Sequence, residues 1–275
     1  MSAGVQELAG LQGLDWGLLA APFAAGLLVL ATHVVLGIDV LRRGIIFIDL
    51  AIAQVAGLGA IAASLTDLDA IFHDFGPPGI GVQVGAQLAA ALAAGIGALL
   101  LTWCERRWPD IQEALIGLVF VFAAAAGILL LARHPQGGEH LRDLLAGQLL
   151  WVNWRQLLPV AVLYIGVLAL WFGPAQRWPR LGFYLLFAIT VTASVQLVGV
   201  LLVFASLIAP AVATRAFSGG RRIVIGYLAG AVGYAMGLGL SLYADLPAGA
   251  TVVCCLCLTA IAGLGCFRRE GRGLY

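Results

Sequence analysis

The sequence predicts an all-α integral membrane protein with about nine transmembrane helices. Hydrophobic residues fill 62% of the 275 positions and charged residues only 11%, less than half of the roughly 25% typical of soluble domains. The mean hydropathy is +1.01. The apolar residues gather in runs of about 20, which is the length that an α-helix needs to cross the hydrocarbon core.

Nine apolar runs follow one another, separated by short polar or glycine- and proline-containing breaks. The sixth and seventh runs adjoin with almost no polar break, so they form either two helices joined by a tight turn near Gly199 or one long irregular element. No soluble domain, long linker or tandem repeat is evident, so residues 1–275 are expected to form a single transmembrane domain. The expected spans are 14–37, 44–65, 80–103, 111–132, 157–173, 181–198, 199–217, 223–243 and 247–267.

Two segments outside these runs have expected roles of their own. The residues before the first run lack the basic cluster that precedes a cleaved signal sequence, so the first span is expected to act as an uncleaved insertion signal. Residues 141–156 are too polar to span a bilayer. Trp151 and Trp154 within them favour a helix that lies at the membrane interface.

The arginines predict the orientation, because cytoplasmic loops of membrane proteins are enriched in basic residues. All 15 basic residues are arginines. With the N-terminus outside and the C-terminus in the cytoplasm, only Arg133, Arg142 and Arg155 lie outside, and 12 of the 15 lie inside. The net charge of +1 gives no basis for a nucleic-acid partner.

Residues 198–222, with the sequence VGVLLVFASLIAPAVATRAFSGGRR, combine an apolar run with a proline and a basic end. Pro210 frees a backbone carbonyl and is expected to bend the helix. Residues 215–222 are expected to form a short basic helix that ends at two glycines. This pattern is typical either of a helix that docks onto a cytoplasmic partner or of a plain basic loop that only sets the orientation.

Four stretches resemble the permease subunits of ABC importers for zinc, manganese and iron. The family's V-L-R-R-M-A-L-x-G-D-A-L-S-H-A-x-L-P-G signature resembles VLRRGIIFIDLAIAQVAGLGA. Its G-x-L-L-V-x-A-L-L-x-x-P-A-A-T-A region resembles GVLLVFASLIAPAVATRAF. The family's A-x-I-G-x-x-F-x-x-x-x-A-x-G motif, followed by L-x-G-x-I-L-x-V-S, resembles EALIGLVFVFAAAAGILLLA followed by LRDLLAGQLLWVNWRQL. Its G-L-x-L-S-x-x-x-D-x-P-x-G-x-x-I-V motif resembles GLSLYADLPAGATVVC. The matches occur in the family's order and cover roughly residues 14–267.

The resemblance implies a multi-pass protein of the bacterial inner membrane that moves a divalent metal ion through a pore made with a second copy of itself. In related importers for vitamin B12 and siderophores, the region that corresponds to the residues around Pro210 forms a coupling helix, which sits in a groove of the ATPase. Pro210, Arg215, Arg221 and Arg222 are therefore expected to couple the permease to cytoplasmic ABC ATPase subunits. No GxxxxGK[ST] loop is present, so ATP hydrolysis is expected in that separate chain. An extracellular or periplasmic metal-binding protein is expected to deliver the ion.

Asp49 is the main candidate for the transport pathway, because an ionisable group within a span is costly. In the resembling family an aspartate and a histidine four residues apart on this helix face the pathway and hold a metal ion. Asp49 matches the acid, but the position four residues later is Ala53. In the alternative register Gln54 takes the place of the histidine and Leu50 that of the acid. The competing role for Asp49 is an ion pair with Arg42 or Arg43.

Two more polar residues are candidates for the pathway. His33, near the inner end of the first span, either hydrogen-bonds to a backbone carbonyl or contacts a metal. Gln196 in the sixth span either lines the pathway or bridges helices. No resident cofactor is expected beyond the transported ion, and the missing histidine leaves the metal open.

Other functions remain as alternatives. One is an ABC permease for another substrate, such as a metal chelate, and another is a secondary transporter without an ATPase. A membrane-embedded enzyme is disfavoured because no HExxH, DDxxD or Ser-His arrangement is evident in the sequence.

Overall fold

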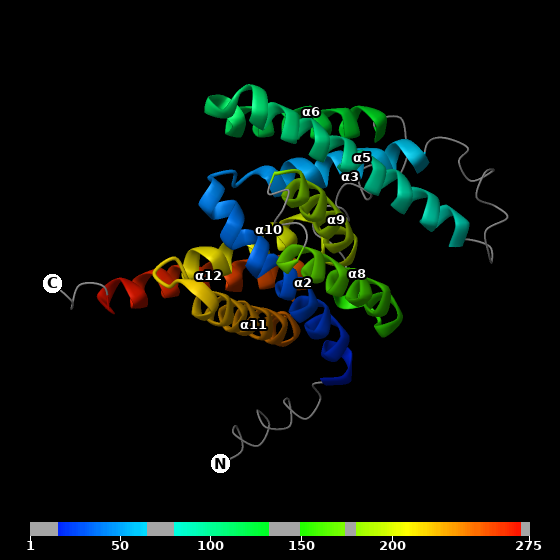
Figure 1. The fold of residues 1–275 in the computed structure, drawn as a ribbon. Coiled ribbons are helices and arrows are strands. Elements are labelled where there is room, and N and C mark those ends of the chain that lie inside the picture. Colours follow the sequence, from blue (N-terminus) through cyan, green and yellow to red (C-terminus); the bar gives the residue numbers. More distant parts are fainter. Residues whose placement is uncertain (1–15, 65–79, 132–148, 174–179, 271–275) are drawn as a thin grey trace, which may run out of the picture.

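The computed structural model describes residues 16–64, 80–131, 149–173 and 180–270. Helices make up nearly all of this part of the chain (Figure 1), with two short 3₁₀ turns, η1 (Pro109–Ile111) and η2 (Leu149–Trp151). The α-helices are α2 (Trp16–Arg43), α3 (Ile48–Ser64), α5 (Ile80–Arg107), α6 (Gln112–Leu131), α8 (Trp154–Phe172), α9 (Leu181–Val198), α10 (Val200–Ala213), α11 (Gly219–Ala244) and α12 (Ala248–Glu270).

Each predicted span corresponds to one of these α-helices, so the all-α membrane fold is confirmed. Seven helices among the described residues are long and apolar enough to cross a bilayer, and α3 and α10 are shorter apolar helices. The sixth and seventh spans are separate helices, as one of the two alternatives predicted. The break lies at Gly199, whose φ of 84° is a conformation that favours glycine.

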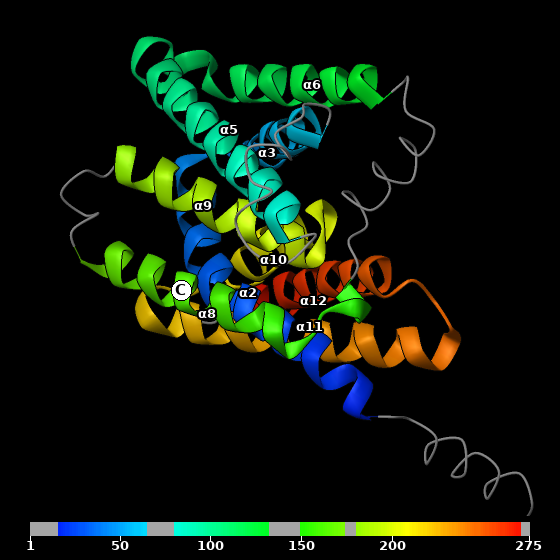
Figure 2. The same cartoon turned by 90° about the vertical axis from the view of Figure 1, so that its right-hand side faces the viewer.

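The helices form three groups that lie beside one another (Figures 1 and 2). One edge of the molecule holds α3, α5 and α6, the opposite edge holds α8, α11 and α12, and the middle holds α2, α9 and α10. Small residues allow the close packing of these helices. A Cβ added to Gly37 of α2 would lie 2.0 Å from the backbone oxygen of Leu207 in α10, so the two backbones touch there.

Asn153 fixes the start of α8. Its side chain accepts hydrogen bonds from the backbone N–H groups of Arg155 and Gln156, at 3.1 and 3.2 Å. The Gln156 side chain in turn accepts one from the Asn153 N–H at 3.0 Å, which completes a capping box. Of the expected interfacial helix over 141–156, residues 141–148 lie outside the described residues. The remainder forms η2 and the first turn of α8, with Trp151 and Trp154 exposed.

The basic segment after Pro210 differs from the expectation and requires a correction. Helix α10 continues through Pro210 to Ala213, and a turn then leads directly into α11. No separate helix covers 215–222. Gly219 and Gly220 begin α11 rather than end a short helix, because Gly219 enters it with a φ of 61°. The side chains of Arg221 and Arg222 therefore belong to the first turn of a long helix.

Arginines gather at one end of the helices. The C-terminal ends of α2, α5 and α10 lie there with the N-terminal ends of α3, α6, α9 and α11, on the left of Figure 2. We call this the arginine-rich end. Among its arginines in the described helices and turns are Arg42, Arg43, Arg106, Arg107, Arg180, Arg215, Arg221 and Arg222. Arg155, at the start of α8, lies at the opposite end.

Candidate functional site

Asp49 is an unpaired acid inside the protein. It lies in the first turn of α3 and is 0% exposed. Neither carboxylate oxygen has a hydrogen-bond partner among the described residues. The positive end of the α3 dipole favours a negative charge at this position, but a buried carboxylate without a partner is still strongly disfavoured. An unsatisfied acid of this kind within a membrane helix is a candidate for binding a cation.

The competing role for Asp49, an ion pair with Arg42 or Arg43, is wrong. Both arginines donate instead to Asp39, which lies one helical turn before them in α2. The Arg42 guanidinium bonds to Asp39 Oδ1, and Arg43 Nε lies 2.7 Å from Asp39 Oδ2. Asp39 is buried, and the guanidinium of Arg43 also lies 4.3 Å from the ring centroid of Phe183 in α9.

Asp39 is missing from the sequence candidates because the first span was predicted to end at residue 37, whereas α2 ends at Arg43. The signal that identifies it is the spacing of three and four residues to the arginines, which places all three side chains on one face of a helix. The pairing occupies both arginines, and Asp49 has no hydrogen-bond partner in the part of the chain that the structure describes.

The first turn of α9 joins three other helices at the arginine-rich end. Arg180 lies 3.6 Å from Glu105 of α5. The hydroxyl of Tyr184 accepts a hydrogen bond from Gln112 of α6. Since Arg43 of α2 packs on the neighbouring Phe183, this turn connects α2, α5 and α6 and holds the end of the molecule together.

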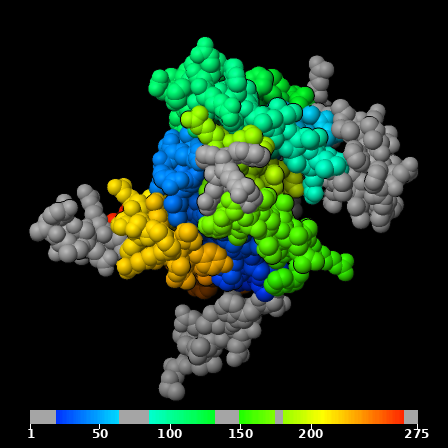
Figure 3. All heavy atoms as spheres, viewed as in Figure 1, coloured from blue at the N-terminus to red at the C-terminus, as the bar shows by residue number. Residues whose placement is uncertain are grey.

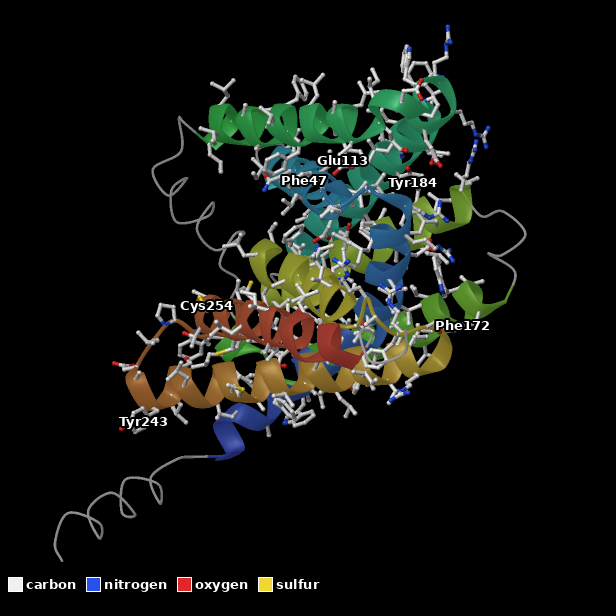
Figure 4. All side chains as sticks on the ribbon, turned by 90° about the vertical axis from the view of Figure 1, so that its left-hand side faces the viewer. Phe47, Glu113, Phe172, Tyr184, Tyr243 and Cys254 are labelled. Atoms are coloured by element: carbon white, nitrogen blue, oxygen red, sulfur yellow. The ribbon has the colours of Figure 1, made fainter. Side chains whose placement is uncertain are left out.

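Glu113 links α6 to the start of α3. One of its oxygens accepts a hydrogen bond from the backbone N–H of Phe47 at 3.2 Å, and Figure 4 shows the two residues side by side. The other oxygen, like one oxygen of Glu105, is buried without a hydrogen-bond partner in the described part of the chain. These acids are dispersed, because the described residues contain no group of three or more His, Cys, Asp or Glu placed to hold a metal ion.

His33 is fully buried in α2. Its Nδ1 lies 2.9 Å from the backbone oxygen of Val29 and 3.1 Å from the Thr32 hydroxyl, so it makes the carbonyl hydrogen bond that was one of its two expected roles. Its Nε2 has no partner among the described residues. No hydrogen bond joins His33 to Asp49, and their helices pack mainly on different neighbours: α2 on α10 and α11, α3 on α5 and α6.

The remaining pathway candidates differ in burial. Ala53, at the position where the resembling family has its histidine, is part of the hydrophobic core. Gln54 is half-buried on α3. Gln196 is exposed, although most of α9 is buried. The structure joins it to neither Asp49 nor His33.

The coupling candidates surround the junction of α10 and α11. Pro210 is buried, and Arg215 and Arg221 are exposed. Arg222 donates to the Ala211 carbonyl at 3.2 Å. That carbonyl lies in the last turn of α10, where backbone donors run out and a cation is favoured. Arg222 therefore ties the start of α11 to the end of α10.

Comparisons with known proteins support one family over nearly the whole chain. The model of the ABC 3 transport family matches residues 16–176 and 175–266. A relative named high-affinity zinc uptake system membrane protein ZnuB, from Haemophilus influenzae, is 25% identical over 213 residues, which are 70% of this chain and 81% of the relative. A structure of PsaBC from Streptococcus pneumoniae in complex with Fab is similar with a TM-score of 0.64. It is 19% identical and covers 94% of each chain, so this likeness shows the fold.

Proposed function

Because this chain belongs to the ABC 3 transport family, we propose that it is the membrane permease subunit of an ATP-driven importer of divalent metal ions. The observation that carries the proposal is the family match over residues 16–266, supported by a fold of apolar helices similar to PsaBC. The printed name of the Haemophilus relative supports a metal as the substrate. Hydrolysis of ATP takes place in a separate ATPase chain.

The arginine-rich end faces the cytoplasm in this proposal, since basic residues concentrate on that side of a bacterial inner membrane. Helix α12 ends at the same end, which supports a cytoplasmic C-terminus. Two copies of the chain form the pore, and an external binding protein delivers the ion at the opposite end. The ATPases dock at the junction of α10 and α11, where exposed Arg215 and Arg221 offer contacts and Arg222 links the two helices.

Asp49 supplies the charge that attracts the cation. A carboxylate that lacks a hydrogen-bond partner among the described residues gains favourable electrostatics when a divalent ion passes, and a second copy contributes a second carboxylate. The histidine position holds Ala53, so Asp49 acts without the imidazole that suits zinc. Carboxylate, amide and water oxygens suit manganese better than zinc. Manganese is therefore the preferred substrate in this proposal.

The test of the function is the metal content of whole cells grown under metal limitation. We expect one divalent metal to fall in a strain that lacks the gene and to return when the gene is restored. An ABC ATPase should copurify with the tagged chain. Copurification without any change in metal content would retain the ABC permease and point to another substrate, such as a metal chelate. The absence of a bound ATPase would favour a secondary transporter.

A further inference from the structure

Helix α5 has two faces of opposite character. One face is made of small residues such as Ala90, Ala94 and Ala98, all of them buried. The opposite face carries large apolar side chains that are exposed, and its spacing of three to four residues keeps them in one line. We call this line the α5 stripe, and it consists of Leu88, Leu92, Ile96, Leu99 and Trp103. In a membrane protein such a face is suited to lipid.

The stripe leads to two arginines between two tryptophans at the arginine-rich end. Trp103 and Trp108 contact edge to face, with ring centroids 5.1 Å apart. The guanidinium of Arg107 lies 5.7 Å from the Trp108 ring centroid, and Arg106 beside it is exposed. Tryptophans of this kind prefer the level of the lipid headgroups.

Neither arginine has a carboxylate within ion-pair distance in the described part of the chain. The neighbouring Glu105 lies against Arg180 instead. Asp110, which is exposed in η1, is the other acid close in sequence. Its negative charge offsets one of the two positive charges of Arg106 and Arg107 and leaves a net local charge of +1. Two unpaired guanidiniums at headgroup level complement an anionic group.

We propose that the α5 stripe and the pair Arg106 and Arg107 form a binding site for an anionic phospholipid. The phosphate accepts hydrogen bonds from the two guanidiniums, and the acyl chain lies along the stripe. From Leu88 to Trp103 the stripe is about 22 Å long at 1.5 Å per residue, more than half of the roughly 30 Å hydrocarbon core. Helices α5 and α6 form one edge of the molecule, away from α11 (Figures 2 and 3), where lipid has access. The inference requires a membrane location but not a particular transported substrate.

The test is native mass spectrometry of the purified full chain with equal amounts of phosphatidylglycerol and phosphatidylcholine. We expect wild type to retain phosphatidylglycerol in preference. The double variant Arg106→Gln/Arg107→Gln should lose about five-fold in that preference for each arginine removed, since each basic residue near an anionic surface has an effect of this order. Arg155→Gln is the matched control, because Arg155 is also exposed beside tryptophans but lies at the opposite end. It should retain the preference.

Two results would overturn the site. One is equal retention of phosphatidylglycerol by wild type and the double variant. The other is a protein cross-link between two copies through Ile96→Cys, absent from the wild type with its native cysteines, which would show that a second copy covers the stripe. Neither result would affect the transport proposal, which is tested by metal content.

Discussion

Replacement of Arg43 by glutamine should destabilise the protein far more than the same change at Arg42, although both arginines bind Asp39. The Arg43 side chain is 23% exposed, and that of Arg42 is 76% exposed. A hydrogen bond to a buried charge contributes about 1.5–3 kcal/mol, and the stacking of Arg43 on Phe183 adds about 0.5–1 kcal/mol. The expected loss is therefore about 2–4 kcal/mol for Arg43→Gln. The exposed pair at Arg42 is worth only about 0.2–1 kcal/mol.

The assay is reversible unfolding of the purified protein in mixed micelles with increasing SDS, followed by circular dichroism. Arg42→Gln serves as the control, because it removes the same charge from the same turn of α2. Equal losses for the two variants would refute the assignment of Arg43 as the arginine that compensates Asp39. A loss near zero for both would show that the ion pair contributes nothing to stability.

Three further changes test the packing, a helix cap and the helix junction. Gly37→Ala should destabilise the protein by about 1–3 kcal/mol in the same assay, because the new Cβ meets the backbone of α10. Gly95→Ala is the control and should be neutral or stabilising, because nothing lies within 4 Å of the added carbon. Asn153→Ala removes the cap of α8 and should cost about 1 kcal/mol; no change would contradict the capping box. Arg222→Gln should speed tryptic cleavage between α10 and α11 relative to Arg221→Gln, and equal rates would dismiss the link to the α10 carbonyl.

The helices could be predicted from the sequence because length and hydropathy alone decide whether a segment can cross a bilayer. The break at Gly199 was evident as one of two alternatives, since glycine is the residue that accepts the positive φ found there. The ends of the helices could not be predicted to the residue. Helix α2 continues to Arg43, because Arg42 and Arg43 both pair with Asp39 and so stabilise its last turn.

The candidate site could be predicted only in part. Asp49 follows from the cost of an acid within a span, and its burial agrees with that reasoning. Its lack of a partner depends on Asp39, whose pairing with the arginines requires the correct end of α2. The two glycines at the start of α11 indicated a helix end, but glycine at a positive φ serves equally at a helix start. Gln196 is exposed on α9, and the structure joins it to neither Asp49 nor His33, so its relation to the pathway stays a prediction.

The central claim is that the carboxylate of Asp49 attracts the transported cation, and metal accumulation by Asp49→Asn tests it most directly. The matched control is Asp245→Asn, since Asp245 is exposed at the turn between α11 and α12 and its left-handed conformation, with a φ of 51°, suits asparagine. Both variants would be expressed at equal levels in the strain that lacks the gene. We predict that Asp245→Asn restores the metal as wild type does and that Asp49→Asn does not. Full restoration by Asp49→Asn would contradict the claim.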